Sequence, residues 1–193
     1  MEENRRKSDR RIKYTRMVIR DSFIDLLENK NISKITVKEI CEGADVNRAT
    51  FYAHFSDQYD LLKQIELEII TDIGSYLDTR SIGGAEFTIP FEMLKNVLEY
   101  VKKNARLCTV LLSPNGDISF QQEITSILGR QFVLAWFAGR TVDPSEIEFI
   151  YLFAASGSVG VVRRWLSDGT RNSTSEMAEL LLKIASRGTQ AFM

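Results

Sequence analysis

The chain of 193 residues contains one histidine, His54, and two cysteines, Cys41 and Cys108. A zinc site needs three or four ligands at short, regular spacing, and nucleophilic catalysis needs a nucleophile paired with a base. Neither pattern surrounds His54, and two distant cysteines form neither a disulfide framework nor a metal motif. The sequence therefore predicts no metal, no cofactor and no enzymatic activity. His54 is left either as a contact to a large ligand or as a packed residue that braces its helix.

Basic residues concentrate near the N-terminus. Between residues 5 and 20, eight basic residues accompany a single acidic one, although the formal net charge of the whole chain is −1. The eight are Arg5, Arg6, Lys7, Arg10, Arg11, Lys13, Arg16 and Arg20. Such a run suits a polyanion, and the alternative is a solvated, partly disordered tail.

Apolar residues recur at helical spacing along almost the whole chain, which predicts an all-α protein of about nine helices. No segment has the roughly 18 consecutive apolar residues that a membrane span requires, and no signal-peptide pattern opens the chain. We therefore expect no membrane partner and a cytoplasmic location.

The first half of the chain predicts three helices followed by a long fourth one. The first helix is expected to end near the polar run at residues 28–31, and the capping box Thr36-Val-Lys-Glu39 starts the second at residue 37. Asn47 is expected to cap a short third helix over residues 48–55, and Ser56 a fourth that runs to about residue 79. Gly43 is expected to favour the chain reversal between the second and third helices.

The second and third predicted helices, joined by a tight turn, have the arrangement of a helix-turn-helix DNA-binding unit. Phe51 and Phe55 share one face of the third helix and are expected to pack inward. Arg48, Thr50 and Tyr52 then point outward, where a short helix can present them to a major groove.

The stretch TVKEICEGADVNRATFYAHFSDQYDLL, residues 36–62, resembles the N-terminal signature of the TetR/AcrR family of bacterial transcriptional regulators. The resemblance covers roughly residues 12–65. It implies a helix-turn-helix DNA-binding domain with a basic arm, residues 1–57, and a helical ligand-binding and dimerisation domain, residues 58–193. It also implies the DNA contacts, with phosphate contacts at Thr36 and His54 and base or backbone contacts on the third helix. The candidate DNA-binding residues are Thr36, Asn47, Arg48, Ala49, Thr50, Tyr52, His54 and Gln58.

One position departs from the family pattern. Many members carry a lysine that holds a phosphate at the start of the fourth helix, where this chain has Gln58. Glutamine can donate a hydrogen bond but releases no counterion, so affinity for the DNA backbone is expected to depend more on the basic arm.

The second half resembles the family more loosely. Asp143-Pro-Ser-Glu146 predicts a helix over residues 144–167, and Ser173-Thr-Ser-Glu176 predicts a last helix over residues 174–192. The resemblance implies that these two helices form a homodimer interface. Two DNA-binding units could then reach successive major grooves about 34 Å apart on a near-palindromic operator.

Aromatic residues of the second half could line a pocket for a small hydrophobic effector, although most are expected to belong to the core. Phe132, Trp136 and Phe153 are the candidate pocket residues. The leading hypothesis is a DNA-binding repressor relieved by such an effector. The alternative is a TetR-like protein that acts mainly by binding a partner protein such as an enzyme. A helical-bundle enzyme is a third option, but the sequence lacks its Glu-x-x-His motif.

Overall fold

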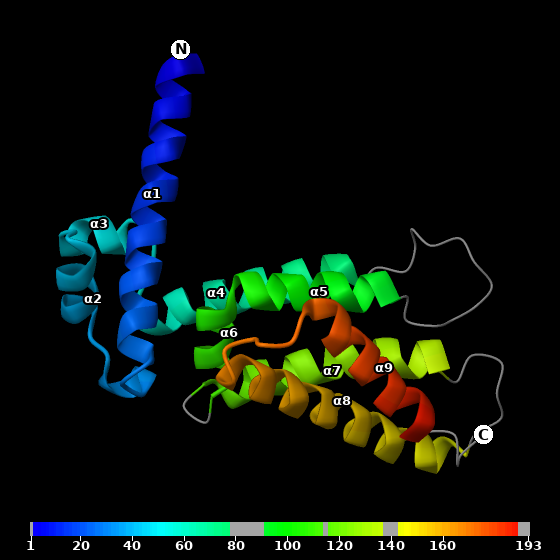
Figure 1. Ribbon diagram of the computed structural model, residues 1–193. Coiled ribbons are helices and arrows are strands. Elements are labelled where there is room, and N and C mark those ends of the chain that lie inside the picture. Colours follow the sequence, from blue (N-terminus) through cyan, green and yellow to red (C-terminus); the bar gives the residue numbers. More distant parts are fainter. Residues whose placement is uncertain (1, 78–90, 114–115, 137–142, 189–193) are drawn as a thin grey trace. The chain divides into compact units, whose positions relative to one another are not determined.

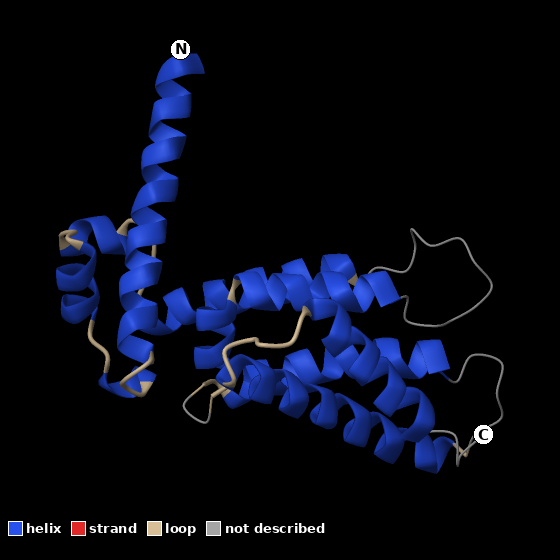
Figure 2. Cartoon of the chain, viewed as in Figure 1, coloured by secondary structure: helices blue, strands red, loops and turns tan. Residues whose placement is uncertain are grey.

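The computed structural model describes residues 2–77, 91–113, 116–136 and 143–188. Side chains at 2–8, 129–136, 144–145 and 186–188 also lie outside the described part. All regular secondary structure of the described residues is helical (Figure 2). This confirms the all-α prediction. None of the described helices is long and apolar enough to cross a membrane.

The helices follow the predicted order closely (Figure 1). They are α1 (Glu2–Leu27), the short 3-10 helix η1 (Ile32–Lys34), α2 (Val37–Ala44), α3 (Arg48–Tyr52), α4 (Gln58–Tyr76), α5 (Phe91–Lys103), α6 (Ala105–Leu111), α7 (Ile118–Trp136), α8 (Pro144–Ser167) and α9 (Thr174–Gly188). Residues 79 and 192, where the sequence predicts the ends of the fourth and last helices, lie outside the described residues.

The chain forms two compact units, Met1–Glu68 and Ile69–Met193. The sequence predicts the boundary before α4, at residues 57 and 58, whereas the units meet inside that helix. The reason is packing, because the first half of α4 buries Leu61, Leu62 and Ile65. The side chains of Gln64 and Glu68 also bind to α1.

The core of the first unit forms where α1 packs on α2 and α2 packs on α3. Its fully buried side chains are Ile19, Phe23, Ile35, Ile40, Phe51 and Leu61. The buried Ser22 hydroxyl of α1 donates a hydrogen bond of 2.9 Å to the backbone carbonyl of Ile40 in α2. A polar contact thus fixes the position of α2 within an otherwise apolar interface.

Gly43 has a different role from the one predicted. The chain reverses at Asp45, which adopts the left-handed conformation with φ 51° and ends α2. Gly43 lies inside α2, where a Cβ atom would overlap the Ser22 Oγ of α1. The glycine is therefore needed for the close approach of two helices rather than for the turn.

We expect Gly43→Ala to destabilise the first unit by about 1–3 kcal/mol, because the new methyl group overpacks the α1–α2 contact. In a Ser22→Ala background the overlap with Oγ disappears, so the same substitution should cost less or become favourable through helix propensity. Chemical denaturation of the four variants measures this coupling. Gly74→Ala in α4 is the control, because its Cβ would meet no atom within 4 Å. If Gly43→Ala lowers the free energy of unfolding equally with Ser22 and with Ala at position 22, the glycine is not needed for the contact with Ser22.

The α3 and α4 ends also differ from the sequence prediction. The α3 helix ends at Tyr52, and residues 53–55 form a turn that buries Phe55. The residue before α4 is Asp57, whose carboxylate accepts hydrogen bonds of 2.8 Å from the backbone N–H groups of Tyr59 and Asp60. Asp57, rather than the predicted Ser56, is therefore the capping residue.

In the second unit α5 packs on α9, α7 packs on α8, and α6 contacts both α5 and α8. The α8 helix has its predicted bounds and begins with Pro144. The capping box of α9 is present, because Ser173 and Glu176 exchange hydrogen bonds of 2.7–3.2 Å. These local signals fix where the last two helices begin.

Candidate DNA-binding interface and effector cavity

The short helix α3 presents a polar outer face. Phe51 is fully buried beneath it, and Phe55 is 3% exposed in the turn that follows. Their rings lie 5.6 Å apart and anchor the helix to the core. Arg48 and Ala49 are exposed on the other side, and Tyr52 is 56% exposed. The arrangement leaves a guanidinium and a phenol free to reach a large ligand.

Asn47 and Thr50 hold the start of α3 in place. The Asn47 side-chain oxygen accepts a hydrogen bond of 2.8 Å from the Thr50 backbone N–H and one of 3.0 Å from its hydroxyl. Thr50 is therefore half-buried with its hydroxyl engaged, and not free as Arg48 and Tyr52 are. Both residues orient the start of the helix, and these hydrogen bonds use only the oxygen of the Asn47 amide.

Ala53 is not among the DNA-binding residues predicted from the sequence, although it lies on the outer face beside them. This residue is exposed in the turn and lies four positions after Ala49, so the two methyl groups share the outer face. These two small side chains leave the backbone of the outer face accessible. The i, i+4 spacing of the alanines was the available signal.

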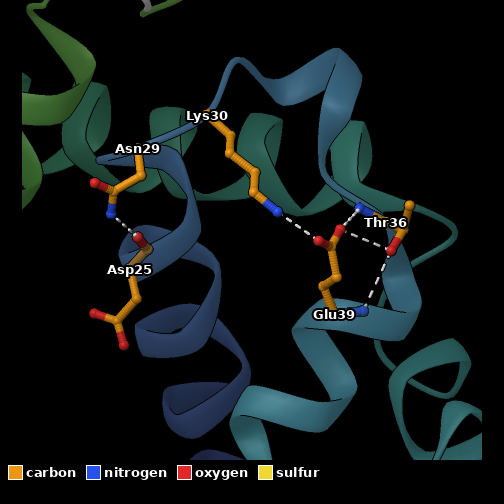
Figure 3. A network of polar contacts seen from close by, with 5 residues as sticks. All are labelled: Asp25, Asn29, Lys30, Thr36 and Glu39. Atoms are coloured by element: carbon orange, nitrogen blue, oxygen red, sulfur yellow. Dashed lines mark hydrogen bonds and ion pairs between the residues drawn. The ribbon is translucent and has the colours of Figure 1, made fainter.

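At the N-terminus of α2, the hydrogen-bond donors of the capping residue Thr36 are satisfied by Glu39 of the same helix. The Glu39 carboxylate accepts hydrogen bonds from the Thr36 backbone N–H at 3.0 Å and from its hydroxyl at 2.9 Å. Figure 3 shows Lys30, from the turn after α1, bound to the other oxygen of the same carboxylate. In the same view the Asn29 amide donates to the backbone carbonyl of Asp25 near the end of α1. The network fixes the connection between the two helices.

The network lowers the pKa of Glu39 from 4.5 to about 2, first through the hydrogen bond from Lys30 and then through those from Thr36. A folded-state pKa below the ordinary value means that the ionised form stabilises the fold. That stabilisation is complete above about pH 4.5 and is lost as the pH falls toward 2. The backbone N–H of Ser56 lowers the pKa of Asp60 in the same sense.

We expect Glu39→Gln to be less stable than the wild type at pH 7, with the difference shrinking between pH 4.5 and 2. Denaturant unfolding measured along this pH range tests the expectation. Glu42→Gln removes the same charge from the same helix, where the partner Lys38 lies 3.7 Å away and both side chains are largely exposed. That control should have little effect. A difference in the free energy of unfolding between the wild type and Glu39→Gln that does not change with pH would refute the lowered pKa of Glu39.

The start of α4 carries two carboxylates and no lysine. Asp57 accepts a hydrogen bond from a backbone N–H group in the first turn of the helix. Asp60 accepts a hydrogen bond of 2.8 Å from the Ser56 backbone N–H. Gln58, the first residue of the helix, is half-buried. The N–H groups that would attract a phosphate are thus partly satisfied within the protein.

His54 follows α3 in the turn. Its ring is half-buried and lies 6.2 Å from the ring of Phe55. Among the described residues, no three His, Cys, Asp or Glu side chains gather closely enough to hold a metal ion. The position is compatible with both sequence interpretations, a phosphate contact and a packed brace.

Two members of the basic run are used inside the first unit. Arg20 forms an ion pair of 2.7 Å with Glu68 of α4. Arg16 donates to Gln64 at 3.0 Å, and its guanidinium lies 5.0 Å above the ring of Phe55. These arginines join α1 to α4 and are not free for DNA, whereas Arg10, Arg11 and Lys13 are exposed.

The second unit contains an apolar cavity of about 110 Å³. Six helices contribute to its wall, among them α4 with Ile73, α5 with Val97 and α8 with Ala155. The lining residues that the structure describes are aliphatic apart from Phe120, Cys108 and Ser158, and none of them is charged. Such a cavity suits a small neutral apolar molecule.

One of the three predicted pocket residues, Phe153, does not line this cavity. Phe153 is 77% exposed on the outer side of α8 and does not line it. Its position in the helix register turns it away from Ala155 and Val159, which face inward. The side chains of Phe132 and Trp136 lie outside the described residues.

Exposed apolar side chains gather on the last two helices. On α8, Phe149 is 73% and Leu152 is 54% exposed, next to Phe153. On α9, Leu180 and Ile184 are 44% and 48% exposed. Large apolar residues at i, i+3 and i+4 on a helix surface are typical of a contact with another chain.

A short capped helix held outward on a three-helix unit, in a chain that also has a helical unit with a cavity, is typical of helix-turn-helix transcriptional regulators. Residues 19–65 match the bacterial regulatory proteins of the tetR family, and residues 89–187, half of the chain, match a transcriptional regulator C-terminal region. The chain therefore belongs to the TetR family. Regulators of this family bind DNA operators and dimerise.

Individual relatives agree with this assignment. The uncharacterised HTH-type transcriptional regulator YxbF of Bacillus subtilis is 30% identical over 80 residues, a match that covers 41% of this chain and 21% of that protein. A TetR transcriptional regulator from Streptococcus agalactiae is 25% identical with a TM-score of 0.66, over 92% of this chain and 97% of that one. NalD, the secondary repressor of the MexAB-OprM multidrug efflux pump in Pseudomonas aeruginosa, is 20% identical. Its TM-score is 0.62, over 92% of this chain and 97% of that one.

Proposed function

We propose that this protein is a homodimeric repressor that binds a near-palindromic operator through α3 and releases it when a small apolar effector enters the cavity. The observation that carries the DNA-binding part is the exposure of Arg48 and Tyr52 above the buried Phe51. The proposed place of action is the cytoplasm, where a bacterial regulator meets DNA. The proposal involves no catalytic step.

The proposed contacts divide by chemistry. Arg48 and Tyr52 reach base edges, because a guanidinium can pair with guanine and a phenol can donate or accept. Ala49 and Ala53 allow close approach. Thr36, His54 and Gln58 contact phosphates and set the position of the helix on the duplex, which carries little sequence information.

The cavity supports a small-molecule effector over a partner protein as the signal. Its volume of about 110 Å³ approaches that of engineered cavities that bind benzene-sized molecules. A ligand that prefers one arrangement of the dimer would shift the spacing of the two α3 helices and so change operator affinity. Since none of the described lining side chains is charged, a neutral ligand is favoured over an ionised one.

Filling the cavity tests this proposal. We expect Ala155→Leu, which adds a side chain at a buried wall position of α8, to keep operator binding and to lose release by apolar compounds. Gel-shift titration with a panel of neutral and ionised aromatic and short-chain compounds measures release. Thr109→Leu, at an exposed position of α6, is the control and should respond like the wild type. Release only by ionised compounds, or unchanged release from Ala155→Leu, would refute the effector site. Operator binding that activates transcription in a reporter assay would refute repression.

A further inference from the structure

The outer face of α3 has an apolar centre formed by two exposed residues, Ala49 and Ala53, which we call the alanine pair. The Ala53 backbone N–H donates a hydrogen bond of 3.0 Å to the Ala49 carbonyl, so Ala53 keeps a helical position although α3 ends at Tyr52. Cβ atoms four residues apart on a helix lie about 5–6 Å from each other on one face. Arg48 and Tyr52, also four residues apart, border the alanine pair. The face therefore presents two methyl groups beside a guanidinium and a phenol.

The polar groups at the start of α3 limit which bases the helix can recognise. The Asn47 side-chain oxygen accepts hydrogen bonds from both the backbone N–H and the hydroxyl of Thr50, which uses both of its lone pairs. Asn47 therefore lacks the free acceptor that an asparagine needs to bind adenine with two hydrogen bonds. Residues 47–55 contain no Asp or Glu, the side chains that accept from the cytosine amino group. Recognition of guanine by Arg48 remains available.

Thymine is the base whose chemistry matches the alanine pair. Its C5-methyl group is the apolar group that the major groove displays, and alanine is among the side chains that contact it. An alanine side chain neither donates nor accepts a hydrogen bond, so it gains nothing from the polar edges of the other bases. Contact with the thymine methyl group removes apolar surface from water, which is favourable.

We propose that Ala49 and Ala53 are specificity-determining residues, which contact the methyl group of a thymine in each operator half-site. Arg48 binds a guanine in the same half-site, so the operator motif contains both bases. The inference rests on the proposed operator binding and adds which base the alanine pair selects. Uracil keeps the hydrogen-bonding groups of thymine and lacks only the methyl group, so it isolates this contact.

The test replaces each thymine of a selected operator by deoxyuridine, one position at a time and in both half-sites together. At one position we expect the Kd of the wild type to rise about 4-fold for each half-site, or about 15-fold in total, because one buried methyl group is lost in each. Fluorescence anisotropy with labelled duplexes measures the Kd. Deoxyuridine in place of a thymine outside the half-sites is the control and should leave the Kd unchanged.

Variants of α3 test whether the alanine pair makes this contact. Ala49→Gly/Ala53→Gly removes both methyl groups of the protein, so it should bind the thymine and deoxyuridine operators with equal affinity. Ala53→Gly alone, which changes only the turn after α3, should reduce the ratio of the two Kd values part of the way. Tyr52→Phe keeps the alanine pair and should retain the wild-type ratio. Because glycine lowers helix propensity, circular dichroism checks the fold of each variant.

Wild-type protein that binds every deoxyuridine operator as tightly as the thymine operator would overturn the inference, and so would a selected half-site without thymine. A wild-type ratio in both glycine variants would also overturn it, because the methyl group would then act through another part of the protein or through the shape of the duplex. If selection enriches no motif, the proposed function itself fails. If Arg48→Ala weakens operator binding while deoxyuridine has no effect at any position, only this inference fails.

Discussion

Arg48→Ala should raise the Kd for the operator by about 30-fold or more without changing the free energy of unfolding. A bidentate arginine–base contact is worth about 1–3 kcal/mol, and a dimer makes two such contacts. Arg48 is exposed at the first position of α3, so its truncation leaves no cavity in the core. Fluorescence anisotropy with labelled operator measures the Kd, and circular dichroism checks the fold.

Tyr52 allows a finer version of the same experiment. Its ring packs edge-on against Phe51 at 5.6 Å, while the side chain remains 56% exposed. Tyr52→Phe keeps this packing and removes only the hydroxyl, so a loss of affinity would be assigned to a polar contact with DNA. Arg171→Ala, an exposed arginine of the second unit, is the matched control. If both Arg48→Ala and Tyr52→Ala bind the operator with wild-type affinity, α3 is not the helix that reads the DNA sequence.

The second large effect is expected on the outer face of α8. Phe149→Asp combined with Phe153→Asp should convert the dimer to a monomer of 22.0 kDa, because the charged groups would have to be buried unpaired in the interface. Both phenylalanines are more than 70% exposed in the single chain, so the substitutions should leave its core intact. Sedimentation equilibrium measures the mass.

Operator affinity should fall together with dimerisation, because one protomer reads only one half-site. Tyr59→Asp is the control, since Tyr59 is a large side chain that is 50% exposed on α4 in the first unit. A dimer that survives both substitutions in α8, or one that dissociates in Tyr59→Asp, would contradict the interface.

Local signals predicted much of the fold. The capping boxes at Thr36 and Ser173 and the proline at the start of α8 each mark a helix start that the structure contains. These signals depend on residues within one helical turn, so they can be recognised without knowledge of the tertiary structure.

Long-range packing could not be predicted in the same way. The role of Gly43 depends on Ser22, which lies 21 positions earlier, and the role of Arg16 depends on Gln64, 48 positions later. The same limit applies to the cavity of the second unit, since its wall combines aliphatic residues from six helices. Aromatic composition directed the prediction to Phe153, which the helix register places on the outside.

Selection of bound duplexes from a random pool tests the central claim most directly. If two α3 helices read DNA from a symmetric dimer, the selected sequences should contain two inverted half-sites with centres about 10 base pairs, or a multiple of that, apart. The Arg48→Ala protein should lose the preferred base at one position of each half-site. A pool without any enriched motif, or a motif unaffected by Arg48→Ala, would contradict the account.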